Sequence, residues 1–146
     1  MGWERAVTAV HGRMRSGWTD AAVPVLLRNG EGLDNKPFAA PTGKPWLFVE
    51  LRWSGGGGGS IDGVVRRREG HIWLHAFVPF GIGIEEAHRL AAAAAALFEQ
   101  QDVAGVVCAD ALPGGESSAT VPSQIKGSWD GESVSIPFTF DEVFPS

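Results

Sequence analysis

The first residues in this sequence that could support chemistry are two histidines, His71 and His75. They are four residues apart, which suits a metal site when both lie on one face of a helix. The apolar alternation of Ile72, Leu74 and Ala76 indicates a strand instead. Residues four apart along a strand are separated by roughly 13 Å, too far to share one ion. We therefore expect no metal site and interpret both imidazoles as outward-facing or interfacial.

A second candidate is a pair of glycines, Gly81 and Gly83, between an expected strand and an expected helix. This is where a dinucleotide-binding loop would begin, but the third glycine of that motif falls on Glu86. Glu85 and Glu86 at a helix N-terminus would repel a pyrophosphate. The glycines therefore indicate a tight turn, and we expect no cofactor.

The remaining candidates for catalysis are a single thiol and scattered carboxylates. Cys108 is the only cysteine, so no internal disulfide can form, and its flanks Val106 and Val107 favour a small buried apolar residue. A lone free thiol suits a reducing compartment. No G-x-S-x-G motif is present, and no pair of acids stands out in the sequence. We therefore predict a protein without catalytic residues, not an enzyme.

The elements that would position these residues can be predicted from periodicity and turn signals. Helices are expected at residues 3–18 and 84–100, the second containing six consecutive alanines. Strands are expected at residues 23–27, 46–53 and 103–109, with Pro24 favouring an edge position or a strand beginning for the first. Residues 28–45 form a long loop in this prediction, rich in Asn, Asp, Gly and Pro.

Two hairpins complete the prediction. The first joins residues 61–67 to residues 71–80 around Glu69-Gly70. The second joins residues 124–129 to residues 132–140 around Asp130-Gly131, and Pro137 favours an edge strand or a bulge there. Residues 55–60, five glycines and a serine, are expected to be a flexible loop, either natural or an engineered linker.

Length and composition indicate one soluble α+β domain spanning residues 1–146, a mostly antiparallel sheet with two helices packed on it. Hydrophobic residues make up 44% and charged residues 20%, ordinary values for a globular protein. The net charge of −5 argues against a nucleic-acid binder that works through a basic face. No apolar run is long enough to predict a membrane span.

The order of these elements resembles the tail-terminator proteins of long-tailed phages and of phage-derived gene transfer agents. The similarity lies in four stretches that span residues 23–142: Arg28-Asn29 with Pro37-Phe38 and Pro45-Trp46-Leu47-Phe48-Val49; Arg68-Glu69-Gly70-His71-Ile72-Trp73 with Phe77-Val78-Pro79-Phe80-Gly81-Ile82-Gly83; the alanine-rich helix ending at Ala96-Leu97-Phe98; and Val134-Ser135-Ile136-Pro137-Phe138 with Asp141-Glu142.

The resemblance implies a homohexameric ring that caps the tail tube, ends tube polymerisation and joins the head connector. Its partners would be its own copies, the tail tube protein and the head-completion or connector protein, with DNA only as passing cargo and no membrane. Its place would be the tail of a particle assembled in the bacterial cytoplasm. Aromatic residues opposite the expected core, or in the long loop, are candidate contacts: Trp46, Phe48, Trp73, Phe77 and Phe38.

Three alternatives stay open at this point. The protein could be a neck or head–tail joining subunit, a tail tube subunit, or a small-molecule-binding α+β module. The aromatic residues have a second interpretation as well, because they could pack under the first helix if both faces of the sheet were covered. A large apolar pocket with two or more titratable groups would favour the binding module.

Overall fold

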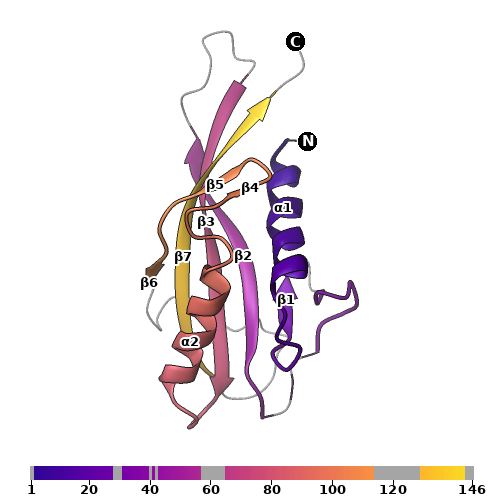
Figure 1. Cartoon of the computed structure of the whole chain (residues 1–146), viewed down its shortest axis with the longest axis vertical. Coiled ribbons are helices and arrows are strands. Elements are labelled where there is room, and N and C mark those ends of the chain that lie inside the picture. Colours follow the sequence, from indigo (N-terminus) through magenta and orange to yellow (C-terminus); the bar gives the residue numbers. More distant parts are fainter. Residues whose placement is uncertain are drawn as a thin grey trace.

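The computed structural model describes residues 2–27, 31–39, 41, 43–56, 65–113 and 129–143, which form two helices and one curled sheet of seven strands (Figure 1). The expected α+β class, a mostly antiparallel sheet with two helices packed on it, is confirmed. The sheet order is β1-β2-β3-β7-β5-β4, with β6 also paired to β7. The elements are α1 (Gly2–Gly17), β1 (Val25–Leu27), β2 (Trp46–Gly56), β3 (Val65–Pro79), α2 (Ile84–Ala95), β4 (Asp102–Val103), β5 (Val106–Cys108), β6 (Leu112–Pro113) and β7 (Trp129–Val143).

One face of the sheet carries the main hydrophobic core. Alternate residues of the three long strands point to this face and pack against both helices, which lie on the same side (Figure 1). The helices contribute residues at three- and four-residue spacing, as the sequence pattern predicts. The largest members of this core include Met14, Leu47, Leu51, Ile72, Leu74, Leu90, Phe98 and Ile136, each less than 2% exposed.

The helix α1 is anchored to the segment that follows α2. The Arg13 Nε donates a hydrogen bond to the Leu97 carbonyl over 2.9 Å. A Cβ on Gly17 would lie 2.8 Å from the Leu97 side chain. The Leu97 side chain therefore packs directly against the backbone at the end of α1. The expected helix at residues 3–18 is confirmed, and its last turn is held in place by a contact between residues distant in sequence.

The predicted hairpin turn at Glu69-Gly70 is wrong, because β3 runs through it without a break. A Cβ on Gly70 would lie 2.6 Å from the Arg52 carbonyl oxygen and 2.9 Å from Cζ of Phe138. Glycine is therefore needed there for close approach between β2, β3 and the Phe138 ring, and not for a turn. Residues 61–64, the start of the predicted first strand, lie outside the described residues.

The predicted turn at Asp130-Gly131 is wrong for a similar reason. Both residues lie inside β7, which pairs with β3 from Val65↔Val143 to Pro79↔Trp129. Long-range pairing with β3 outweighs the local turn preference of the dipeptide. Residues 124–128 of the predicted partner strand are outside the described residues.

Pro137 does not lie on an edge strand, since β7 is flanked by β3 on one side and by β5 and β6 on the other. Its carbonyl accepts a hydrogen bond from the Ala109 N–H over 2.8 Å, so its nitrogen faces the same side. On that side β5 pairs as far as Phe138 and β6 resumes at Ser135. The missing donor of the proline therefore falls at the break between two short strands.

The single strand predicted at residues 103–109 is in fact a small hairpin of β4 and β5. Ala104 and Gly105 have φ of 50° and 97°, and the Asp102 carboxylate accepts the Gly105 N–H over 2.9 Å. The predicted helix at residues 84–100 begins as expected but ends at Ala95. Turns follow it, and Gln100 has a φ of 57°, which reverses the chain toward β4.

The remaining predictions concern the N-terminal half. The strand expected at residues 23–27 begins at Val25, directly after Pro24, and is the edge strand next to β2. The strand expected at residues 46–53 is confirmed and continues to Gly56, so the first two glycines of the predicted loop 55–60 belong to β2. Residues 57–60 lie outside the described residues. None of the helices in the described ranges is long and apolar enough to span a membrane.

Replacing Gly70 with alanine should destabilise the protein, because the Arg52 carbonyl that its Cβ would meet is held in the sheet. We expect a loss of about 1–3 kcal/mol in the free energy of unfolding, measured by urea denaturation. Gly12→Ala is the matched control, since a Cβ there meets nothing within 4 Å and lies in α1. It should gain about 0.5–1 kcal/mol. An unchanged stability of Gly70→Ala would contradict the close approach.

Candidate protein-interaction surface

The second face of the sheet, which we call the outer face, lies opposite the main core. It is formed by the alternate residues of β2, β3 and β7 that point away from the helices, and each row crosses the three strands in register. The rows are Trp46, Phe77 and Gly131; Phe48, His75 and Ser133; Glu50, Trp73 and Ser135; and Arg52, His71 and Pro137.

One end of the outer face is a small aromatic core of its own. Trp46 and Phe77 are buried there with Leu26 of β1, and their rings lie 4.6 Å apart. The Phe38 ring is 5.4 Å from Trp46, and the Trp129 ring meets Trp46 edge-on at 5.8 Å. The aromatic residues therefore pack under the 31–39 loop and the start of β7 rather than under α1. Of the five candidate contacts, Trp46 and Phe77 are buried, while Phe38, Phe48 and Trp73 stay partly exposed.

A chain of hydrogen bonds crosses the middle of the outer face. The His75 ring is only 1% exposed, with Nδ1 2.6 Å from the Ser133 hydroxyl and Nε2 2.9 Å from a Glu50 carboxylate oxygen. It stacks against Trp73, with ring centroids 5.8 Å apart and an interplanar angle of 7°. Both histidines of the predicted pair therefore lie on the outer face, opposite the main core, but His75 is buried there and His71 is partly exposed.

The Glu50 carboxylate is held in its charged form by this network. Burial alone would raise the pKa of Glu50, but hydrogen bonds from His75 and Arg52, together with their charges, outweigh burial and lower the pKa below its ordinary value of 4.5. The Arg52 guanidinium also lies over the Trp73 ring, 4.9 Å from its centroid. Charge and aromatic stacking thus connect β2 to β3 across the outer face.

The serine, histidine and glutamate of this network are the residue types of a hydrolase triad, but their arrangement does not suit nucleophilic attack. The Ser133 side chain has no solvent exposure, so a substrate carbonyl cannot reach its oxygen. What the network does is satisfy polar groups buried between aromatic rings, which leaves the sheet in a single register. Within the described ranges, no three His, Cys, Asp or Glu side chains gather as metal ligands.

At His71 the outer face is hollowed into a groove of about 320 Å³. Its walls include His71, Pro137 and the half-exposed Val107. The groove also lies next to Cys108, whose pKa burial raises to about 11, with a further contribution from the charge of Asp102. That thiol stays protonated at neutral pH, in agreement with a structural role.

A second exposed surface is the apolar loop, residues 80–84, which joins β3 to α2 at one end of the molecule (Figure 1). Phe80 is 75% exposed, Ile82 55% and Ile84 40%. Gly81 and Gly83 have φ of 94° and 112°, which confirms that the glycine pair makes a tight strand-to-helix turn. Three large apolar side chains are therefore exposed within five residues, which makes this loop a candidate for protein contact.

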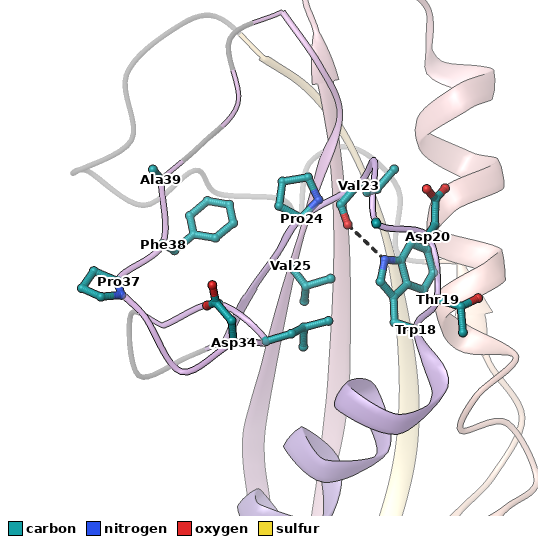
Figure 2. Close-up of a pocket in the computed structure, with 13 residues that line it drawn as sticks. Trp18, Thr19, Asp20, Val23, Pro24, Val25, Asp34, Pro37, Phe38 and Ala39 are labelled. Carbon is teal, nitrogen blue, oxygen red and sulfur yellow. Dashed lines mark hydrogen bonds between the residues drawn. The ribbon is translucent and has the colours of Figure 1, made fainter.

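A third surface is the edge pocket, a hollow of about 490 Å³ between the α1–β1 connection and the 31–39 loop. Figure 2 shows Trp18, Pro24, Val25 and Phe38 around it. Asp20 and Asp34 are its titratable groups among the described residues, so it meets the sequence criterion for a binding module. Both carboxylates also fold local turns, since Asp20 accepts the Ala22 N–H and Asp34 the Lys36 N–H, each over 3.0 Å.

The sequence identified the aromatic residues of the outer face but missed the His75 network and the edge pocket. The network depends on the register that sets His75 opposite Ser133 and Phe48, residues 58 and 27 positions away in the chain. The pocket depends on how the 31–39 loop is held by Arg15 across from Trp18. The local sequence signals for the pocket are two Asx turns. In each, an aspartate, Asp20 or Asp34, accepts the backbone N–H of the residue two positions later.

Two comparisons with known proteins found matches to this chain. A family model described as phage tail terminator protein matches residues 6–138. Nine chains of solved structures match as well; one aligns over 100% of this chain and 99% of its own length, at 19% sequence identity and a TM-score of 0.58. At that identity the likeness shows the fold alone. No curated protein sequence matches the chain.

The His75 network makes the free energy of unfolding depend on pH in the acidic range. Because the folded pKa of Glu50 is lowered, its charge stabilises the fold above pH 4.5, and this contribution is lost as pH falls through the folded pKa. Glu50→Gln should therefore cost about 1 kcal/mol at pH 7 and less at pH 3, measured by urea denaturation.

The exposed pair of Glu86 and Arg89 provides the control for this prediction. Glu86→Gln removes a carboxylate that is also paired with an arginine but lies at the surface, so its effect should be smaller than that of Glu50→Gln at pH 7. Equal losses for Glu50→Gln at pH 7 and pH 3 would show that the charge of Glu50 does not stabilise the fold.

Proposed function

The chain belongs to the phage tail terminator family, and on that premise we propose that it caps the tail tube of a long-tailed phage or gene transfer agent. In this role a homohexameric ring sits on the last ring of the tube, ends its polymerisation and presents the surface that joins the head connector. DNA passes through the ring only as cargo. The observation that carries the proposal is the family match, which covers all but the ends of the chain.

The exposed surfaces support an assembly role. A ring of identical subunits uses two different patches on each copy, because the contact between neighbours is heterologous. The apolar loop and the partly exposed side of the outer face, with Phe48 and Trp73, are two such patches in different parts of the molecule. Aromatic and large aliphatic side chains are the usual anchors of protein interfaces.

We also propose that the role is structural rather than catalytic. The triad-like residues are enclosed, with Ser133 inaccessible and His75 nearly so. Cys108 is a protonated thiol at neutral pH. The edge pocket is the observation that favours the alternative of a binding module, and its two carboxylates are engaged in turns that the 31–39 loop and the α1–β1 connection need. The role of that pocket is taken up in the next subsection.

Deleting the gene in the producing bacterium tests the capping role directly. Without a cap, the tube should continue to grow, so negative-stain images should show headless tails longer than normal, and a plasmid copy of the gene should restore normal length. Loss of a neck protein would instead give headless tails of normal length, and loss of a tube subunit would give no tails. Normal particles after deletion would refute the proposal.

The apolar loop should be needed for assembly but not for folding. Phe80→Ser with Ile82→Ser removes two exposed apolar side chains, so the thermal midpoint should change little while the hexamer is lost in native mass spectrometry over a concentration series. Leu112→Ser is the control, since Leu112 is 50% exposed and distant in the sequence. A hexamer that survives in the loop variant would remove this loop from the ring contact.

A further inference from the structure

We propose that the edge pocket binds the cationic end of an arginine side chain from a protein partner, with the alkyl part of that side chain against its apolar walls. The partner would be another component of the tail, and in that respect the inference rests on the proposed function. The binding chemistry itself rests only on the residues that form the pocket.

The walls of the pocket are set in place before any ligand arrives. The Trp18 indole N–H donates to the Val23 carbonyl over 3.0 Å, which fixes the ring against the α1–β1 connection (Figure 2). On the other side, Arg15 holds the 31–39 loop through the Leu33 carbonyl at 3.3 Å and the Asn35 side chain at 2.7 Å. The Phe38 ring packs against Trp46, with ring centroids 5.4 Å apart. A preformed site loses little entropy on binding.

The charges of the pocket select a cation. Asp20 and Asp34 each use Oδ1 for a turn, and neither has a further hydrogen bond within the described ranges. In Figure 2 the Asp34 carboxylate stands between Phe38 and Val25, while Asp20 stands beside Trp18. Arg89 interacts electrostatically with Asp20, and Arg15 bonds to the residues on either side of Asp34. A guanidinium beside one of these carboxylates can also stack on an aromatic face of the pocket.

The shape and position of the pocket favour a side chain of a larger molecule. The pocket lies beside β1, which is the last strand of the sheet on that side, so a neighbouring protein can approach it along the sheet edge. Prolines and aliphatic residues, Pro24, Pro37, Val23, Val25 and Leu33, provide the apolar wall that an alkyl stem needs. Arginine combines such a stem with a planar cation that stacks on aromatic rings.

The test uses the full chain and a small probe, butylguanidinium, with neutral butylurea as its uncharged counterpart. The indole N–H of Trp18, assigned by Trp18→Phe, reports occupancy by NMR titration. We expect a saturable shift with butylguanidinium, weakened by added salt, and no saturable shift with butylurea. Saturation by butylurea at equal strength would show a merely apolar pocket, and the absence of saturation by either compound would overturn the inference.

Matched substitutions separate charge from folding. Asp34→Asn and Asp20→Asn keep the oxygen that caps each turn and remove only the charge, so the fold should be unchanged. We expect affinity for butylguanidinium to fall in both variants, by about tenfold in the one whose carboxylate pairs with the cation. Asp102→Asn is the control, because Asp102 caps the β4–β5 turn in the same way outside the pocket. An equal loss in Asp102→Asn would refute the charge argument.

A final arm asks whether the ligand is part of a protein partner. Asp20→Asn with Asp34→Asn, supplied to the deletion strain, should leave more tails without heads or without normal length than Asp102→Asn does. If deletion gives abnormal tails but the double variant gives normal particles, the pocket does not bind a protein partner during assembly. The capping role would then remain intact. Normal particles after deletion, with butylguanidinium still bound, would refute the capping role and leave the site intact.

Discussion

The pairing of β3 with β7 is the constraint on which the rest of the structure depends. The two strands are in register over 15 residues each, and side chains alternate between the faces along this whole length. A slip of one residue would exchange the core face with the outer face. Gly70 admits the Phe138 ring at one point of this pairing, and the hydrogen bond between His75 and Ser133 marks another. Register therefore decides both what is buried and what is offered to partners.

Local patterns in the sequence were sufficient to predict the class of the fold and most of its elements. The alternation along β2 and the apolar spacing in α1 predict which residues enter the core, because each depends on one element alone. The two turn dipeptides misled the prediction, since Gly70 and Gly131 serve a sheet whose pairing partners are distant in the sequence. The buried state of His75 and Trp46 could not be predicted either, because it requires knowing which residues lie across from them.

The outer face divides into a closed part and an open part, and the division has a physical cause. At one end, the 31–39 loop and the start of β7 bring Phe38 and Trp129 over Trp46, which makes a second core without a helix. Beyond it, the buried histidine joins polar residues from all three long strands. Phe48, beside this network, and Trp73, with Arg52 over its ring, stay partly exposed to solvent. The buried part of the outer face thus supports the side chains that stay exposed to solvent, Phe48 and Trp73.

The proline in β7 has a consequence for strand pairing. Backbone donors left unpaired in a sheet can pair with another chain, a process that has no natural stopping point and leads to aggregation. Pro137 has no N–H, and its carbonyl accepts the Ala109 N–H, so this residue leaves no unpaired backbone donor at the gap between β5 and β6. At that point β7 offers no backbone group for strand pairing, and any contact made there is made by side chains.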